Sequence, residues 1–237
     1  MTDRLLYVDG DSYTTPNYCV DVQDSYWKLF GDYLNIDNIV NYAYSGKSND
    51  GIFRNATRFI LDNPDKELFI LLGFTHLERY DVFNRERELA VNAGDSVVNP
   101  NPNPCEIGVE TRSYKQESKE SDVLIYWHRE FDESKFLSSL INFNAFCEKH
   151  NVKFILHFCS HPLVNPEIDL LNTFYKEIDN LPNIVNLFEN TYTSYNQTLN
   201  IKPADFKEFG WVGHHGSEGN KAYAEFLINK YRELYEQ

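Results

Sequence analysis

Mostly apolar runs alternate with segments of helical periodicity along much of the chain. The runs predict strands, and they occur at residues 5–8, 39–43, 68–73, 152–158 and 184–187. The run at 68–73 is the strongest and is typical of a strand covered on both faces. Apolar side chains three and four residues apart predict helices, and they occur at about 23–34, 52–60, 136–146, 168–178 and 222–231. Alternating strands and helices indicate an α/β fold, in which a parallel sheet has helices on both faces.

Length and one polar stretch define the expected domain organisation. A chain of 237 residues is long enough for one sizeable core, and we expect a single domain over residues 1–237. Residues 84–122 are polar and include alternating asparagine and proline at 99–104, which suits neither a helix nor a central strand. We expect an inserted loop or flap there, and irregular structure from 189 to 213.

The loops after the predicted strands carry the residues of chemical interest. Right-handed crossovers place every strand-to-helix loop of a parallel sheet at one edge. Ser12, Gly46, Thr75 and His161 lie in such loops. We therefore expect these four residues to converge at that edge.

Three short segments supply the residue types that acyl transfer through a serine requires. That reaction needs a base within hydrogen-bond reach of the hydroxyl and donors aimed at the developing oxyanion. The segments are Gly-Asp-Ser at 10–12, Ser-Gly at 45–46 and Gly-Phe-Thr-His at 73–76, each after a predicted strand. A pair of histidines, His214 and His215, precedes the last helix.

In this order the segments resemble the blocks of the SGNH/GDSL hydrolases, a family of serine esterases. The resemblance implies a three-layer α/β/α sandwich with a central parallel sheet, the flavodoxin-like arrangement of that family. It implies that Ser12 is the nucleophile and that the N–H groups of Ser12 and Gly46 are oxyanion donors. Thr75 replaces the family's oxyanion-hole asparagine, and its hydroxyl is expected to donate there. Asn49 and Arg79 are the alternative donors.

The histidine pair resembles the family's last block, Asp-x-x-His before the C-terminal helix. Counting back from Gly219 without a gap favours His214 as the base, whereas a helix cap at Ser217 favours His215. Neighbouring side chains of an extended loop point in opposite directions. Only one of the two histidines is therefore expected to reach Ser12.

The aspartate of that last block is missing from its place. The position three before the histidine holds Trp211 or Val212, depending on which histidine is the base. A group that accepts a hydrogen bond from the second ring nitrogen normally orients a catalytic imidazole. Asp205, Glu208 or a backbone carbonyl is the expected substitute.

Charge narrows the classes of partner. The formal net charge is -14 and the pI about 4.9, which repels phosphate backbones and anionic lipid surfaces. We expect no nucleic-acid or membrane partner, and no stretch approaches the ~20 apolar residues of a membrane helix. The start of the chain has no signal-peptide pattern, and the four cysteines form no C-x-x-C pair, so we expect a cytoplasmic protein with free thiols.

Two further patterns are interpreted as structural. Residues 46–48, Gly-Lys-Ser, resemble the end of a phosphate-binding loop, but Asn41 occupies the place of its first glycine, so Lys47 is expected to be exposed. His157, Cys159 and His161 alternate as a soft-metal site would, but a buried cysteine is usually a packing residue. We predict no metal and no cofactor.

The sequence predicts a serine hydrolase that cleaves a small ester through a Ser-His acyl-enzyme mechanism. The expected substrate is a small-molecule or carbohydrate ester, above all a carbohydrate O-acetyl group. Tyr13, Phe74 and Trp211 are expected near the site, where they would stack on a sugar or acyl group. The alternative is a catalytically weak or inactive SGNH-fold protein with a binding or structural role, suggested by the missing aspartate and by Thr75.

Overall fold

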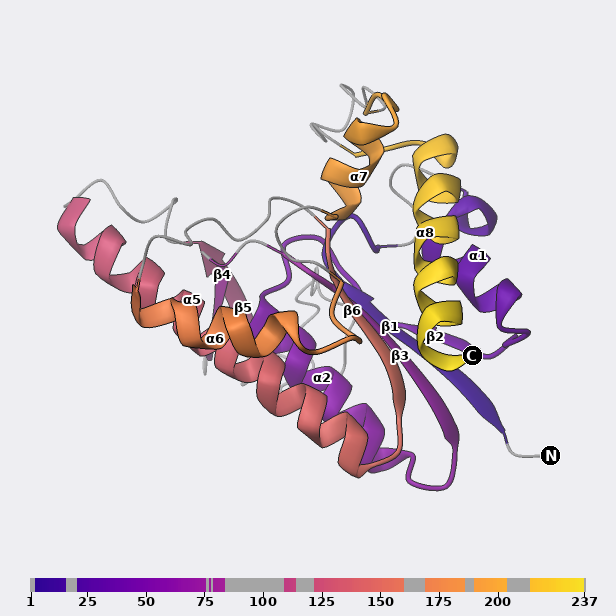
Figure 1. Ribbon diagram of the computed structural model, residues 1–237, viewed down its shortest axis with the longest axis horizontal. Coiled ribbons are helices and arrows are strands. Elements are labelled where there is room, and N and C mark those ends of the chain that lie inside the picture. Colours follow the sequence, from indigo (N-terminus) through magenta and orange to yellow (C-terminus); the bar gives the residue numbers. More distant parts are fainter. Residues whose placement is uncertain are drawn as a thin grey trace, which may run out of the picture.

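A four-stranded parallel sheet forms the centre of the molecule (Figure 1). The computed structural model describes residues 3–15, 21–75, 77, 79–83, 109–113, 122–159, 169–185, 190–203 and 214–236, and the side chains of 79–83, 109–113, 122–132 and 169–172 are outside this description. The strands are β1 (Arg4–Gly10), β2 (Ile39–Asn41), β3 (Glu67–Phe74) and β6 (Lys153–Phe158). Their order is β2-β1-β3-β6, and all three pairings are parallel.

Helices cover both faces of this sheet (Figure 1). One face carries α2 (Asn49–Asp62), α5 (Asp122–Lys149) and α6 (Asp169–Asp179), and the other carries α1 (Tyr26–Tyr33) and α8 (Ser217–Tyr235). Among the described residues, the remaining helical elements are η1 (Val22–Asp24) and α7 (Tyr192–Thr198). The predicted α/β/α sandwich with a central parallel sheet is confirmed.

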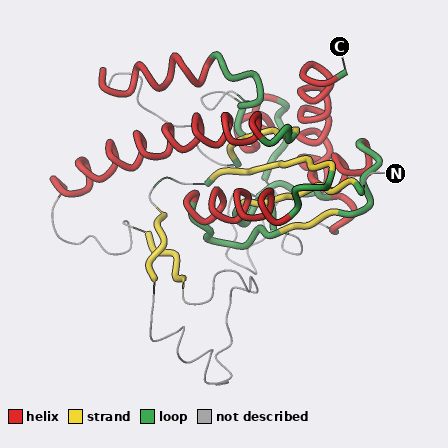
Figure 2. Tube along the Cα trace, turned by 90° about the horizontal axis from the view of Figure 1, so that it is seen from below, coloured by secondary structure: helices red, strands yellow, loops and turns green. Residues whose placement is uncertain are grey.

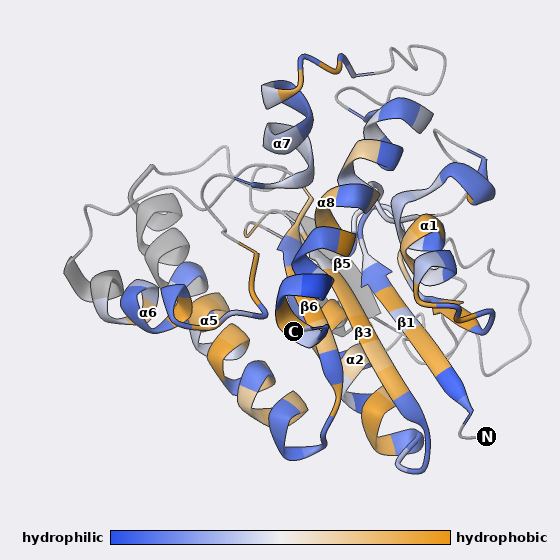
Figure 3. Ribbon diagram, turned by 45° about the vertical axis from the view of Figure 1, so that its right-hand side comes forward, coloured by the Kyte–Doolittle hydropathy of each residue, from blue (hydrophilic) through white to orange (hydrophobic). Residues whose placement is uncertain are grey.

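Alternation along the strands divides the apolar side chains between two cores. In β3, Leu68, Ile70 and Leu72 pack toward α2 and α5, whereas Phe69 and Leu71 pack toward α1 and α8. These five side chains are at most 5% exposed. Burial of each contributes about 1.5–3 kcal/mol, and the central strands are therefore apolar over most of their length (Figure 3).

The second and last strand predictions differ in detail from the structure. β2 ends at Asn41, two residues before the predicted end, although the Tyr42 N–H still donates to the Val8 carbonyl at 2.9 Å. The Asn41 side chain accepts from the Ala43 N–H (2.8 Å) and donates to the Thr14 carbonyl (3.1 Å). The strand predicted at 184–187 is reduced to a bridge between Ile184 and Leu156, and residues 186–187 lie outside the described residues.

Helix and flap predictions also differ. α5 begins at Asp122, well before residue 136. Its first turns contain Leu124, Trp127 and Phe131 at helical spacing, and the prediction missed them. α7 falls in the stretch predicted to be irregular, where Thr191 caps it by accepting from the Ser194 N–H at 3.1 Å. An antiparallel pair stands apart from the main sheet: β4 (Arg79–Phe83) directly precedes the flap predicted at 84–122, and β5 (Val109–Ser113) lies within it (Figure 2).

Topology places the carboxyl ends of β1 and β3 at the switch point of the sheet. From β1 the chain crosses to β2 on one side, and from β2 it returns past β1 to β3 on the other. Crevices in open α/β sheets form at such points, outside the carboxyl ends of the strands. Ser12 follows β1 and Thr75 follows β3, so both lie at this position. In the described part of the chain, no helix has the length and apolarity to span a membrane.

His157 of β6 is enclosed by two tyrosines. Its Nδ1 lies 3.2 Å from the Tyr223 hydroxyl and its Nε2 3.4 Å from the Tyr26 hydroxyl, and the imidazole is fully buried. Burial lowers the pKa of His157 from its ordinary 6.5 to about 3. The buried imidazole is therefore neutral at neutral pH.

Acid should unfold the protein partly through His157. Because its pKa is lowered on folding, its contribution to stability is present above pH 6.5 and is lost as the pH falls toward 3. Between pH 7 and pH 5 this loss should be about 2 kcal/mol. Urea unfolding of the wild type and of His157→Gln at both pH values measures it. An equal pH dependence in the two proteins would contradict the prediction.

Candidate active site

Ser12 lies in a tight turn directly after β1. The Thr14 and Thr15 N–H groups both donate to the Asp11 carbonyl at 3.0 Å, and the Tyr13 N–H donates to Asp11 Oδ1 at 3.1 Å. A Cβ at Gly10 would come within 2.4 Å of Thr14 Oγ1, so the start of this turn requires glycine. The turn holds the Ser12 side chain at the switch point with 8% exposure.

His214 contacts the Ser12 hydroxyl. The His214 Nε2 lies 2.9 Å from Ser12 Oγ, and the histidine is 6% exposed. The Tyr13 ring stacks on the imidazole, with centroids 4.1 Å apart and planes inclined by 11°. The hydroxyl can donate to Nε2 in the tautomer that carries its proton on Nδ1. The pair therefore has the geometry of a nucleophile and its base.

His215 points away from Ser12 and into the packing around α8. Its carbonyl accepts from Asn220 Nδ2 at 3.2 Å, and its ring lies edge-on to Tyr192 with centroids 5.4 Å apart. A Cβ at Gly219 would come within 2.5 Å of the His215 Cβ. Burial lowers the pKa of His215, the Lys202 backbone opposes that shift, and His214 adds to it.

The two histidines diverge as expected of neighbours in an extended loop, and His214 is the one that reaches the serine. The prediction that Ser217 caps the last helix, which favoured His215 as the base, is wrong. Gly216 is the N-cap of α8, and Ser217 is the first helical residue.

Gly46 lies in a turn beside the end of β1. The Lys47 N–H donates to the Tyr44 carbonyl at 3.3 Å, and the Tyr44 N–H donates to the Gly10 carbonyl at 3.3 Å. Gly46 has φ of +84°, which favours glycine, and no atom lies within 4 Å of a Cβ placed there. Within the described part of the chain, the backbone N–H groups of Gly46 and Ser12 donate to no protein group.

Thr75 forms hydrogen bonds with both Asn49 and Asp11. The Thr75 N–H donates to Asn49 Oδ1 (2.9 Å), and Asn49 Nδ2 donates to the Thr75 carbonyl (3.1 Å). The Thr75 hydroxyl donates to Asp11 Oδ2 at 2.6 Å. A hydroxyl has one proton, so in this arrangement Thr75 donates to Asp11 and not to an oxyanion. The geometry thus differs from the expected role of Thr75.

Several expected site residues cannot be placed at the site. The side chain of Arg79 and all of His76, His161, Asp205, Glu208 and Trp211 lie outside the described residues. In the part of the chain that is described, no cluster of three His, Cys, Asp or Glu side chains suitable for a metal is present. Cys159 is buried, with Sγ 3.5 Å from Thr14 Oγ1, and Cys147 is a second buried free cysteine.

The chain is similar to solved structures in its fold but not in its sequence. No protein-family model matches the chain, and no curated protein matches it in sequence. The crystal structure of TesA superposes with a TM-score of 0.51 at 11% identity, covering 97% of this chain and 99% of TesA. The chain has the SGNH hydrolase fold.

Further solved structures are similar at lower scores. The psychrotrophic esterase EstA from Pseudoalteromonas sp. gives a TM-score of 0.48 at 11% identity, covering 98% of this chain and 99% of EstA. The acetylxylan esterase Axe2 from Geobacillus stearothermophilus gives 0.43 at 13% identity, covering 96% and 93%. In this SGNH-fold protein, the segments predicted as blocks follow β1, β2 and β3 and precede α8.

Two aromatic residues of the SGNH-fold protein have other roles than those expected. Tyr13 stacks on His214, so that face of its ring is not open to a sugar. Phe74 is fully buried among Phe53, Phe136 and Phe158, and its expected contact with substrate is wrong because its side chain belongs to the core. Tyr13 as a partner of the base was missed, since no sequence pattern reports ring stacking.

The prediction for Lys47 is also wrong. Lys47 was expected to be exposed, but it is fully buried and its Nζ lies 2.8 Å from both carboxylate oxygens of Asp9. The sequence signal was present in Asp9, a carboxylate within the last residues of an apolar strand. A buried charge requires a partner, and the lysine of the facing turn provides it.

Thr75→Val distinguishes the two roles of Thr75. As the partner of buried Asp11, the hydroxyl should contribute about 1.5–3 kcal/mol to stability, because its acceptor is a carboxylate. We expect Thr75→Val to lower the free energy of unfolding by that amount and to lower kcat less than tenfold, with Thr75→Ser close to wild type. A fall in kcat of about a hundredfold at unchanged stability would instead place the hydroxyl in the oxyanion hole.

Proposed function

We propose that this SGNH-fold protein is a serine hydrolase that cleaves carboxylic esters, with Ser12 as nucleophile and His214 as general base. The observation that carries the proposal is the 2.9 Å contact between His214 Nε2 and Ser12 Oγ. These residues are 202 positions apart in the chain and meet at the carboxyl edge of the sheet. A buried serine–histidine contact at a topological switch point supports acyl transfer.

The chemistry follows from the atoms in place. As Ser12 Oγ forms a bond to the ester carbonyl carbon, its proton passes to His214 Nε2, and the carbonyl oxygen becomes an oxyanion. The N–H groups of Ser12 and Gly46 are the proposed donors to that oxyanion. His214 then returns the proton to the leaving alcohol, the C–O bond breaks, and an acyl-Ser12 remains. Water activated by His214 releases the acid.

The Tyr13 ring and an acceptor for the second ring nitrogen of His214 are proposed to support the base. The face of the Tyr13 ring, stacked on His214, favours the imidazolium that forms during the reaction. Asp205 and Glu208 precede His214 in the sequence, and we retain them as proposed acceptors for its second ring nitrogen. A backbone carbonyl of the same loop is the third proposed acceptor for this nitrogen.

We propose a small acyl group on a neutral alcohol as the substrate, above all an O-acetyl group of a carbohydrate. The net charge of -14 supports a neutral substrate, because the field of the protein opposes the approach of anions. Nothing in the proposed steps requires a metal or an organic cofactor.

Initial rates with p-nitrophenyl acetate, butyrate and octanoate, together with acetate release from acetylated xylan, test the proposal. We expect hydrolysis of the acetyl ester with rates that fall as the acyl chain lengthens, and release of acetate from the polysaccharide. Faster hydrolysis of octanoate would contradict the acetyl preference alone. Absence of hydrolysis of every ester would contradict the enzymatic function.

A further inference from the structure

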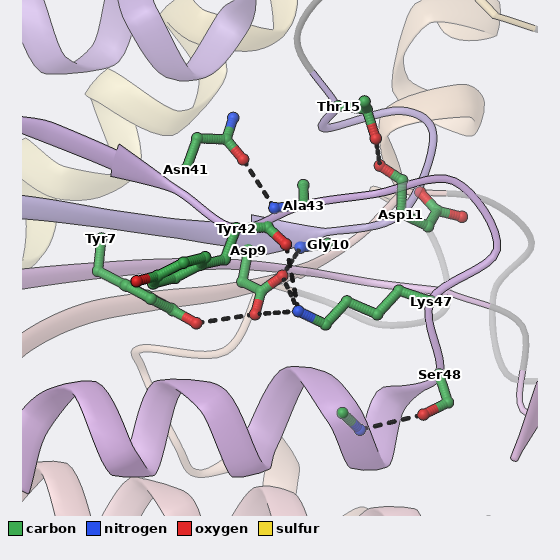
Figure 4. A network of polar contacts seen from close by, with 11 residues as sticks. Tyr7, Asp9, Gly10, Asp11, Thr15, Asn41, Tyr42, Ala43, Lys47 and Ser48 are labelled. Carbon is green, nitrogen blue, oxygen red and sulfur yellow. Dashed lines mark hydrogen bonds and ion pairs between the residues drawn. The ribbon is translucent and has the colours of Figure 1, made fainter. Parts of the chain in front are cut away.

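A fully buried ion pair lies between the end of β1 and the turn that carries Gly46 (Figure 4). Lys47 Nζ donates to Asp9 Oδ1 and Oδ2, both at 2.8 Å, and to the Tyr42 carbonyl at 3.2 Å. The Tyr7 hydroxyl and the Gly10 N–H also donate to the Asp9 carboxylate, each at 2.8 Å. Three protons of the ammonium and both oxygens of the carboxylate are therefore matched.

Such a pair is poorly explained by stability alone. Removing two charges from water is costly, and replacement of a buried ion pair by apolar residues of similar volume is often neutral or stabilising. Burial raises the pKa of Asp9, while the Lys47 ammonium and the hydrogen bonds from Tyr7 and Gly10 oppose that shift. The apolar side chains of β1 and β3 on this face of the sheet pack against α2 and α5 around the pair. A buried pair does, however, fix its two segments in one geometry.

Those two segments carry the proposed oxyanion donors. Asp9 is the third residue before Ser12, and Lys47 directly follows Gly46. The Gly46 turn is also anchored at its two ends: the Tyr44 N–H donates to the Gly10 carbonyl at 3.3 Å, and Ser48 begins α2 by accepting from the Gly51 N–H at 3.0 Å. The ion pair fastens the Lys47 side chain of this turn to Asp9 of β1, the strand that precedes Ser12.

We propose that the Asp9–Lys47 pair positions the Gly46 turn, and with it the Gly46 N–H, relative to Ser12. The inference rests on the proposed function, in which that N–H stabilises the oxyanion. Lys47 and Asp9 are positioning residues, because neither contacts the reacting atoms. Displacement of a preorganised donor by a fraction of an ångström weakens the transition state more than the bound substrate.

The test compares Asp9→Asn/Lys47→Met with Tyr7→Phe. The double variant removes both charges and keeps side chains of similar shape, whereas Tyr7→Phe removes one hydrogen bond to Asp9 and leaves the ion pair intact. We expect kcat for p-nitrophenyl acetate to fall about tenfold or more in the double variant with KM within about twofold. Tyr7→Phe should keep kcat within about twofold of wild type.

A second readout does not depend on activity. The backbone amide resonance of Gly46 in a 15N-labelled protein reports the position of the turn, and it should move in the double variant and stay in place in Tyr7→Phe. If the wild type hydrolyses no ester, the proposed function fails and this resonance alone decides the positioning role. If the wild type is active, both readouts apply.

The outcomes that overturn the inference are specific. A folded double variant with wild-type kcat and an unshifted Gly46 resonance would reduce the pair to a structural element. Equal losses of kcat in the double variant and in Tyr7→Phe would do the same, because a general loss of packing would explain both. If the double variant does not fold, Lys47→Gln replaces it, with an expected loss of kcat of about threefold or more at unchanged KM, and wild-type kcat overturns the inference.

Discussion

Replacement of His214 by glutamine is expected to lower kcat for p-nitrophenyl acetate by about a thousandfold or more. Without the imidazole, nothing at the 2.9 Å position accepts the Ser12 proton as Oγ attacks. Glutamine keeps a planar polar group against the Tyr13 ring, so the local packing should persist. Steady-state kinetics and thermal unfolding of the purified variant measure the two effects separately.

His215→Gln is the matched control for that variant. The His215 ring packs on Tyr192 and beside Gly219 and makes no contact with Ser12, so its loss should reduce stability. We expect kcat within about threefold of wild type and a melting temperature lower by a few degrees. Equal and mild losses of kcat in both variants would mean that neither histidine is the base.

Ser12→Ala is expected to reduce ester hydrolysis to the background rate. The hydroxyl is the proposed nucleophile, and its side chain has 8% exposure at the edge of the sheet and no part in either apolar core. The melting temperature should therefore stay within a few degrees of wild type. Ser45→Ala, at the exposed serine beside Gly46, is the control and should retain activity. Retained turnover in Ser12→Ala would remove the proposed mechanism.

The layers of the fold could be predicted because their signal is local. The apolar runs that became β1, β3 and β6 are covered on both faces, and such strands require continuous apolar residues whatever lies around them. Right-handed crossovers then place Ser12 and Thr75 at one edge, where Asp11 and Thr75 are in hydrogen-bond contact. The choice between His214 and His215 stayed open in the sequence, because it depends on side-chain direction in a loop.

Other features were not predicted because their partners are distant in sequence. A lysine in a polar turn is usually solvated, and only Asp9, 38 residues earlier, explains the burial of Lys47. The hydroxyl of Thr75 was expected to serve the oxyanion because of its place after β3, but Asp11 lies close enough to take its proton. In both cases a buried carboxylate determined the role of its neighbour, and burial is a property of the fold.

The most direct test of the account is the reaction of the protein with a fluorophosphonate, followed by intact mass and peptide mapping. The probe reacts with a serine only when a neighbouring base activates it, so labelling reports the Ser12–His214 pair independently of the choice of substrate. The account predicts one stoichiometric adduct on Ser12, absent in Ser12→Ala and formed far more slowly in His214→Gln. No adduct on Ser12, or an adduct on another residue in a protein that still cleaves esters, would contradict it.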